Sequence, residues 1–146
     1  MHPRTQAREE ALKLLYLLDQ WGELSALASR MRSYFSEAAL PDAVRNYTEA
    51  LVRGTAGHLC ELDALIRRAS AHWETDRMSI VDRNLLRLAL YEICYVAEVP
   101  DAVSIDEAVE LGKKYGGPKT GPFINGVLDA VRKVLRADTA KVGETM

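Results

Sequence analysis

The sequence is 146 residues long, 48% hydrophobic and 27% charged, which is typical of a single globular domain with a substantial core. Its formal net charge of −2 excludes a protein that binds nucleic acid through an overall basic surface, but it is compatible with a local basic patch. The polar N-terminus does not resemble a signal peptide and no apolar run approaches the roughly 18 residues of a membrane span, so we expect a cytoplasmic protein.

Residues 4–20 are predicted to form the first helix. Its apolar side chains follow the spacing of one buried helical face: Ala7, Ala11, Leu14, Leu15 and Leu18. Arg4 and Arg8 are four residues apart, so both are expected on one side of the first two turns, where arginines are commonly solvated. Glu9 and Lys13 form a favourable i, i+4 pair on the outer surface.

A second helix is predicted over residues 23–36, and a turn at Pro41 precedes a much longer one. From residue 42 to about residue 70 the apolar positions keep one helical phase through Gly54 and Gly57. Each internal glycine costs roughly 1 kcal/mol relative to alanine. The unbroken phase nevertheless predicts one continuous helix, with the glycines at sites of close packing. His58 lies on this apolar stripe and is expected to be a packed core histidine.

A polar connection over residues 72–78, which contains Trp73, is predicted to precede the central helix. Ser79 and Asp82 form a weak capping box at its start. Residues 80–97 are apolar around most of the helical circumference, and such a helix belongs in the middle of a bundle.

Ser104 and Glu107 form a second capping-box pattern, which predicts the start of the next helix. The glycine- and proline-rich segment 116–122 cannot continue that helix, and it carries Lys119 in a loop that leads into Phe123. The helical period resumes at Phe123 and ends near Arg136. Residues 138–146 show no periodicity and are expected to be a disordered tail.

No segment alternates like a strand, so the sequence predicts an all-α single domain over residues 1–137 with six or seven helices. Known catalytic motifs are absent, and the loop at 116–122 lacks both the residue order and the preceding strand of a phosphate-binding loop. We therefore expect that the protein is not an enzyme and that it binds no cofactor. The histidines lack the spacing of a metal site, and Cys60 and Cys94 are expected to be buried reduced thiols.

Three segments resemble the NusB family of transcription antitermination factors, along nearly the whole chain. They are RTQAREEALKLLY (4–16), VDRNLLRLALYEI (81–93), and VPDAVSIDEAVELGKKYG followed after a short spacer by FINGVLD (123–129). The resemblance implies about seven helices in two packed subbundles. It further implies binding of single-stranded boxA RNA in nascent ribosomal RNA transcripts together with NusE, a ribosomal small-subunit protein, within the RNA polymerase elongation complex. The resemblance also implies a contribution to ribosome assembly.

The resemblance also implies roles for individual residues. Arg4, Arg8, Lys119 and Phe123 match the RNA-binding region of the family. Cations of that kind hold phosphates, and aromatic rings stack on bases. Tyr16 and Asp82 match positions near the NusE contact. The family often opens with three or more consecutive basic residues, which Thr5 and Gln6 interrupt here, so we expect NusE to supply much of the RNA affinity.

Two alternatives remain compatible with the sequence. The same helical domain occurs at the N-terminus of ribosomal RNA cytosine methyltransferases, but nothing resembling a glycine-rich cofactor-binding unit follows it here. A homodimer that masks the arginine face and regulates access of RNA is the other alternative.

Overall fold

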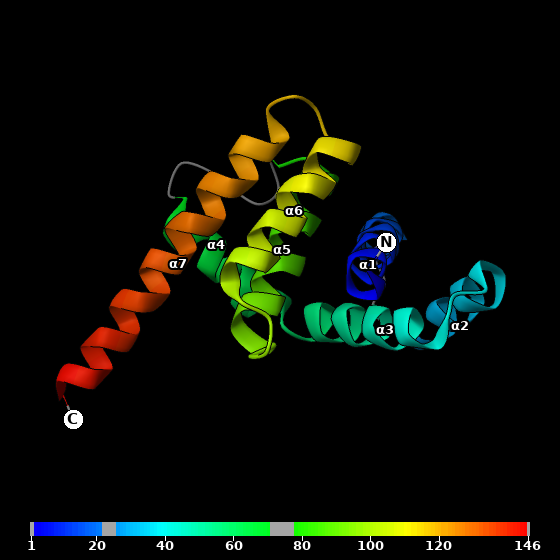
Figure 1. Ribbon diagram of the computed structural model, residues 1–146, viewed down its shortest axis with the longest axis horizontal. Coiled ribbons are helices and arrows are strands. Elements are labelled where there is room, and N and C mark those ends of the chain that lie inside the picture. The colour runs from blue at the N-terminus through cyan, green and yellow to red at the C-terminus, as the bar shows by residue number, and fades with distance from the viewer. Residues whose placement is uncertain (1, 22–25, 71–77, 146) are drawn as a thin grey trace.

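The computed structural model describes residues 2–21, 26–70 and 78–145. Within these ranges the regular elements are all helices, which confirms the predicted all-α class (Figure 1). The helices are α1 (Pro3–Trp21), α2 (Leu27–Ala38), α3 (Asp42–Gly57), α4 (Leu59–Ala69), α5 (Ile80–Tyr95), α6 (Asp101–Tyr115) and α7 (Thr120–Thr145). None of the helices in the described ranges has the length and apolarity to cross a membrane.

Helix α5 is the central element, as its nearly continuous apolar surface predicts. It packs against α1 and α3 on one side and against α4, α6 and α7 on the other, so it joins two groups of helices (Figure 1). Seven of its sixteen residues are buried, and two of these, Asn84 and Glu92, are polar. Ser79 caps the helix as predicted, because its hydroxyl oxygen accepts a hydrogen bond from the Asp82 N–H at 3.1 Å.

The first helix has the predicted buried face, and each of its five apolar residues from Ala7 to Leu18 is at most 4% exposed. The predicted attraction between Glu9 and Lys13 is present, since Lys13 helps to lower the pKa of Glu9, but the shortest polar contacts of both residues are to other partners. Lys13 lies 3.5 Å from Glu10, and Glu9 instead receives a hydrogen bond from Lys114 of α6 at 2.6 Å. Glu9 therefore joins two helices.

The prediction of one continuous helix from residue 42 to residue 70 is wrong, because the chain breaks between α3 and α4 at His58. His58 has φ −124° and ψ 22°, outside the helical range. The apolar positions of α3 and α4 nevertheless keep one helical phase, because both helices pack against α5. Gly54 marks close packing as predicted, because a Cβ there would overlap the Tyr91 ring of α5. The His58 ring is not in the core but stacks on the half-exposed Tyr95 ring at 4.2 Å.

The predicted capping box at residues 104 and 107 is also wrong. Helix α6 begins at Asp101, directly after Pro100, so Ser104 already lies in its interior and is buried. Ser104 and Glu107 bond to other helices instead, as described below. Ser79 with Asp82 and Ser104 with Glu107 show the same spacing of a hydroxyl and a carboxyl group. Only the tertiary structure shows that the first serine caps a helix and the second does not.

The α6–α7 loop is shorter than predicted, because α7 starts at Thr120 and continues to Thr145. The predicted helix end near Arg136 is therefore wrong, and the domain boundary at residue 137 stays a prediction. Cys60 and Cys94 are free but exposed, which corrects the expectation of burial. Most of the connection predicted over residues 72–78, including Trp73, lies outside the described residues.

Candidate nucleic-acid and partner interface

Arg8 is the most deeply buried of the predicted RNA-binding residues, with 5% of its surface exposed. Its Nε donates to both carboxylate oxygens of Glu92, at 3.0 and 2.9 Å. One of its terminal nitrogens lies 3.3 Å from the Glu107 carboxylate of α6. The expectation of an exposed Arg8 is therefore wrong, because its guanidinium is already occupied by two carboxylates inside the bundle.

Glu92 is the centre of this buried network. Besides Arg8 of α1 it accepts hydrogen bonds from the Tyr47 hydroxyl of α3 at 2.5 Å and from the Ser104 hydroxyl of α6 at 2.6 Å. A single carboxylate on α5 thus connects four helices. Burial and the hydrogen bond to Glu92 raise the pKa of Tyr47 above its ordinary value. A buried charge is tolerated only when it is paired and hydrogen-bonded in this way.

Arg4 lies one helical turn before Arg8 but is much more accessible, with 37% of its side chain exposed. Its guanidinium lies 4.6 Å from the centre of the Tyr47 ring and 3.3 Å from Glu98. Tyr47 therefore has two contacts: its hydroxyl binds the buried carboxylate while its ring supports the exposed arginine. Arg4 remains available to an anionic ligand, because its surface partner is itself largely solvated.

Lys119 and Phe123 lie together at the start of α7, where the Phe123 N–H donates to the Lys119 carbonyl at 3.1 Å. Lys119 is exposed, whereas Phe123 is half-buried and packs against the core. The loop before them is held in shape by Thr120, whose hydroxyl accepts from the Gly117 N–H at 3.0 Å. A side chain at Gly116 would overlap Thr120, so that position requires glycine.

The structure does not bring Arg4 and Lys119 into one cluster. The Glu98 partner of Arg4 precedes α6, and Lys119 follows it, so roughly 22 Å of helix separates the two ends at 1.5 Å per residue. Between them α6 crosses α1, and near the C-terminal end of α6 both Lys114 and Tyr115 bond to Glu9. The predicted cations therefore mark the ends of an extended strip along the α1–α6 pair rather than a compact patch.

Tyr16 and Asp82 lie at the other end of α1, near the start of α5. Arg83 fixes this junction, because its guanidinium donates to Asp19 at 2.8 and 3.0 Å. The Tyr16 hydroxyl accepts a hydrogen bond from Gln20 at 3.3 Å, and both Tyr16 and Asp82 are partly exposed. The two predicted partner-binding residues thus lie on adjacent helix ends joined by a partly buried salt bridge.

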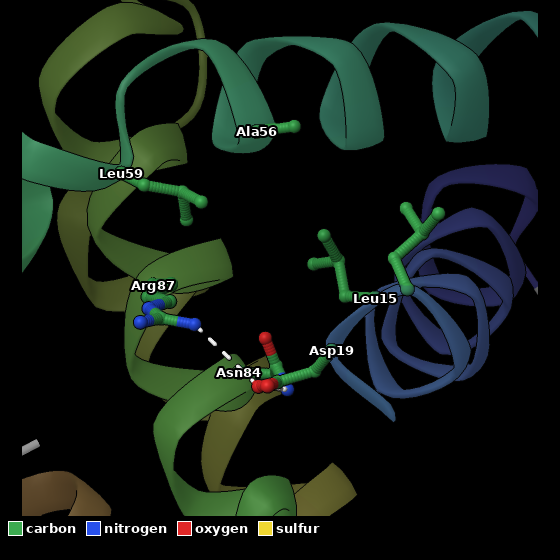
Figure 2. A pocket seen from close by; sticks show the side chains of 7 residues that line it. Leu15, Asp19, Ala56, Leu59, Asn84 and Arg87 are labelled. Carbon is green, nitrogen blue, oxygen red and sulfur yellow. Dashed lines mark hydrogen bonds and ion pairs between the residues drawn. The ribbon is translucent and has the colours of Figure 1, made fainter. Parts of the chain in front are cut away.

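A pocket of about 240 Å³ lies beside this junction, between α1, α3, α4 and α5. Figure 2 shows the side chains that line it. Asp19, Asn84 and Arg87 form its polar side, and Arg87 lies 3.6 Å from Asp19 while it also binds Asp63 of α4 at 2.8 Å. The amino-acid sequence alone predicted no role for these residues or for Glu92. The sequence did contain a signal, because charged side chains are seldom buried in an apolar helix unless they are paired.

No group of histidine, cysteine or acidic side chains in the described ranges is arranged to hold a metal ion.

Comparison with known proteins shows which family the sequence matches. A statistical model described as the NusB family matches residues 5–133. The transcription antitermination protein NusB of Desulfitobacterium hafniense is 39% identical over 143 residues, which cover 98% of this chain and 97% of that protein. The NusB of Myxococcus xanthus is 42% identical over 140 residues, with coverage of 92% and 98%.

Solved structures agree with the sequence relatives. T. maritima NusB has a TM-score of 0.81 and 32% identity, with 91% of this chain and 92% of that chain covered. A chain in the crystal structure of antitermination factors NusB and NusE in complex with dsRNA has a TM-score of 0.81 and 30% identity. The match covers 92% of this chain and 98% of that one.

Proposed function

The chain belongs to the NusB family, and from this premise we propose that it is an RNA-binding transcription antitermination factor. It binds boxA in nascent ribosomal RNA transcripts together with NusE, and it acts in the cytoplasm within the RNA polymerase elongation complex. No catalysed reaction is part of this function. The observation that carries the proposal is the match over 92% of the chain to a structure of NusB with NusE and dsRNA.

The α1–α6 strip supports this proposal and gives its residues separate tasks. Arg4 and Lys119 contact phosphates at the two ends of the strip, and the exposed part of Phe123 stacks on a base. An extended arrangement suits an extended single strand better than a compact cluster would. Arg8 does not contact RNA in this proposal. It fixes Glu92, which holds the Tyr47 hydroxyl and so places the ring that supports Arg4.

Tyr16 and Asp82 are proposed to contact NusE, at the junction that Asp19 and Arg83 hold together. The arrangement separates the two partners along α1, with RNA at its N-terminal half and the protein at its C-terminal half. The same helix can therefore contact both at once, which accounts for joint binding without overlap.

Fluorescence anisotropy with labelled boxA RNA tests the proposal. We expect binding in the presence of NusE at moderate salt, weaker binding without NusE, and weaker binding still of a scrambled RNA of equal length. Since few phosphates are contacted, the log–log salt slope should be shallow, about −0.7 per contact for a single strand. Equal affinity for boxA and scrambled RNA with NusE present, or no binding in either condition, would refute the function.

A further inference from the structure

A groove between α2 and α3 carries a concentration of arginines that the α1–α6 strip does not use. It has a volume of about 500 Å³, and its lining includes Arg32 of α2 and Arg45 and Arg53 of α3. Only one carboxylate, Glu49, is among the residues that line it. A chain with a net charge of −2 thus has, in this groove, three arginines against one acidic residue.

The arginines lie on one side of α3 by virtue of their spacing. Arg45, Glu49 and Arg53 are four residues apart in turn, so they project from the same face of α3, and all three line the groove together with residues of α2. Tyr47, two residues from Arg45, points to a different side of the helix and reaches the buried Glu92. The groove is therefore separate from the network that supports Arg4.

The head groups of these arginines are open to a ligand. Arg45 and Arg53 have 48% and 50% of their side chains exposed, and Arg32 is exposed as well. The pair of Arg45 with Asp42 is loose, at 3.9 Å to a carboxylate that is 89% exposed. Arg53 contacts Glu49 through Nε at 2.9 Å. Such solvated pairs are weak, so an anion of higher charge density can compete for the guanidinium groups.

The floor of the groove favours a nucleic acid over a protein helix. Met31 is 2% exposed and Phe35 is half-buried, and both already pack into the hydrophobic core. Met31 therefore offers almost no surface as an anchor, whereas an amphipathic helix docks through apolar anchors that enter a groove. The charged groups of the lining are three guanidinium groups and one carboxylate, and a guanidinium matches phosphate oxygens with two parallel hydrogen bonds.

We propose that the α2–α3 groove binds the sugar–phosphate backbone of RNA that continues beyond the boxA element. Arg45 and Arg53 are eight residues apart, which is roughly 12 Å along the helix axis, so the groove is long enough for more than one nucleotide. The inference rests on the proposed RNA-binding function, to which it adds a second, sequence-independent contact. It makes the length of the RNA, and not only the boxA sequence, a determinant of affinity.

The test uses the full chain, NusE and two RNAs: a minimal boxA, and boxA extended by about a dozen uridines, a length typical of single-strand sites. The groove variant is Arg32→Gln/Arg45→Gln/Arg53→Gln. Its charge-matched control is Arg67→Gln/Lys133→Gln/Arg136→Gln, which removes the same three positive charges from exposed positions outside the groove. Thermal unfolding of each variant establishes that it is folded before binding is measured.

We expect wild type to bind the extended RNA more tightly than the minimal one, on the order of tenfold for three phosphate contacts at moderate salt. The groove variant should lose that gain and keep the minimal-boxA affinity, and its salt slope for the extended RNA should be shallower by about 2. The control should behave as wild type. The proposal is overturned if wild type shows no gain, if the groove variant keeps the gain, or if the control loses it equally.

Two further measurements separate this proposal from its alternatives. If the groove variant weakens binding of NusE while its RNA affinity is unchanged, the groove contacts protein and the RNA proposal is wrong. Anisotropy with the uridine tract alone distinguishes the groove from the proposed function. Loss of tract binding in the groove variant supports the groove even if boxA is not recognised, and equal tract binding by both proteins contradicts it.

Discussion

Arg4 and Arg8 are one helical turn apart on α1, yet their surroundings differ almost completely. The Arg8 side chain is 6% exposed and its Glu92 partner 2%, whereas the Arg4 side chain is 37% exposed and its Glu98 partner 64%. Both are arginine–carboxylate pairs at hydrogen-bonding distance. The Arg8 pair holds four helices together inside the bundle, and the Arg4 pair sits at the surface.

The difference shows that charge alone does not indicate a binding surface. Neither partner of a buried ion pair can leave the other without an uncompensated charge remaining in the interior. Such a pair therefore serves the fold and cannot be released to bind a ligand. A solvated pair contributes little to stability, and its arginine can therefore change partners when RNA arrives. Tyr47 connects the two environments, because its hydroxyl belongs to the buried pair and its ring to the surface one.

Glu92→Ala should have the largest effect on stability. It leaves the Arg8 charge and the Tyr47 and Ser104 hydroxyls without their partner, and we expect a loss of about 3–5 kcal/mol in the free energy of unfolding. Urea denaturation followed by circular dichroism measures it. Glu98→Ala is the matched control and should cost at most about 1 kcal/mol. Similar losses in both variants would remove the distinction between the two pairs.

Tyr47→Phe separates the contribution of the Tyr47 hydroxyl from that of its ring. It removes the hydrogen bond to the buried carboxylate, at a cost of about 1.5–3 kcal/mol for a bond to a charged group, and it keeps the ring beneath Arg4. The same denaturation experiment measures the cost. A stability equal to that of wild type would show that Glu92 does not require the hydroxyl.

Glu9→Gln tests a contact of intermediate exposure, between α1 and α6. Burial opposes ionisation of Glu9, but the hydrogen bonds from Lys114 and Tyr115 outweigh it and hold the pKa of the carboxyl below its ordinary value of 4.5. A lowered pKa in the folded state stabilises the protein above pH 4.5, and this contribution is lost as the pH falls through the folded-state pKa. The stability advantage of wild type over Glu9→Gln should therefore shrink below pH 4.5.

Thermal unfolding between pH 3 and pH 7 provides that comparison, on both proteins in the same buffers, across the range in which carboxylates ordinarily titrate. Lys114→Gln is the reciprocal variant, because it removes the cation and keeps the carboxylate. An advantage that stays constant with pH would mean that the ionised form of Glu9 is not preferred in the folded protein.

Arg4→Gln should have the smallest effect on stability, within about 1 kcal/mol, because its ion pair is solvated. Arg8→Gln, at the next turn, should be clearly destabilising in the same assay, since it removes the charge that compensates Glu92. If Arg4→Gln were the more destabilising of the two, the assignment of one arginine to the surface and one to the interior would be reversed.

The sequence predicted most of the helices and the central position of α5, because apolar period and burial are linked through helix geometry. It did not predict the break at His58. The apolar phase continues across α3 and α4 because both pack on α5, so the period carries no sign of the break. Gly57 was the available signal, since glycine is favoured where a helix ends.

The interior network was not predictable from spacing. Ser104 and Glu107 have the pattern of a helix cap, but Pro100 allows the helix to start earlier, and the two side chains then meet residues of α1 and α5 that are distant in sequence. Arg8 was placed on the correct helix and side of it, but its depth depends on α6 lying across it. Pairing of buried charges is a tertiary property.

The most direct test of this account is the affinity of Arg4→Gln for boxA RNA with NusE present, beside wild type, at a temperature where both proteins are fully folded. We predict weaker binding and a salt slope reduced by about 0.7, which is the loss of one phosphate contact, with an unchanged unfolding temperature. An affinity and slope equal to those of wild type would contradict the assignment of the exposed arginine of α1 to the RNA.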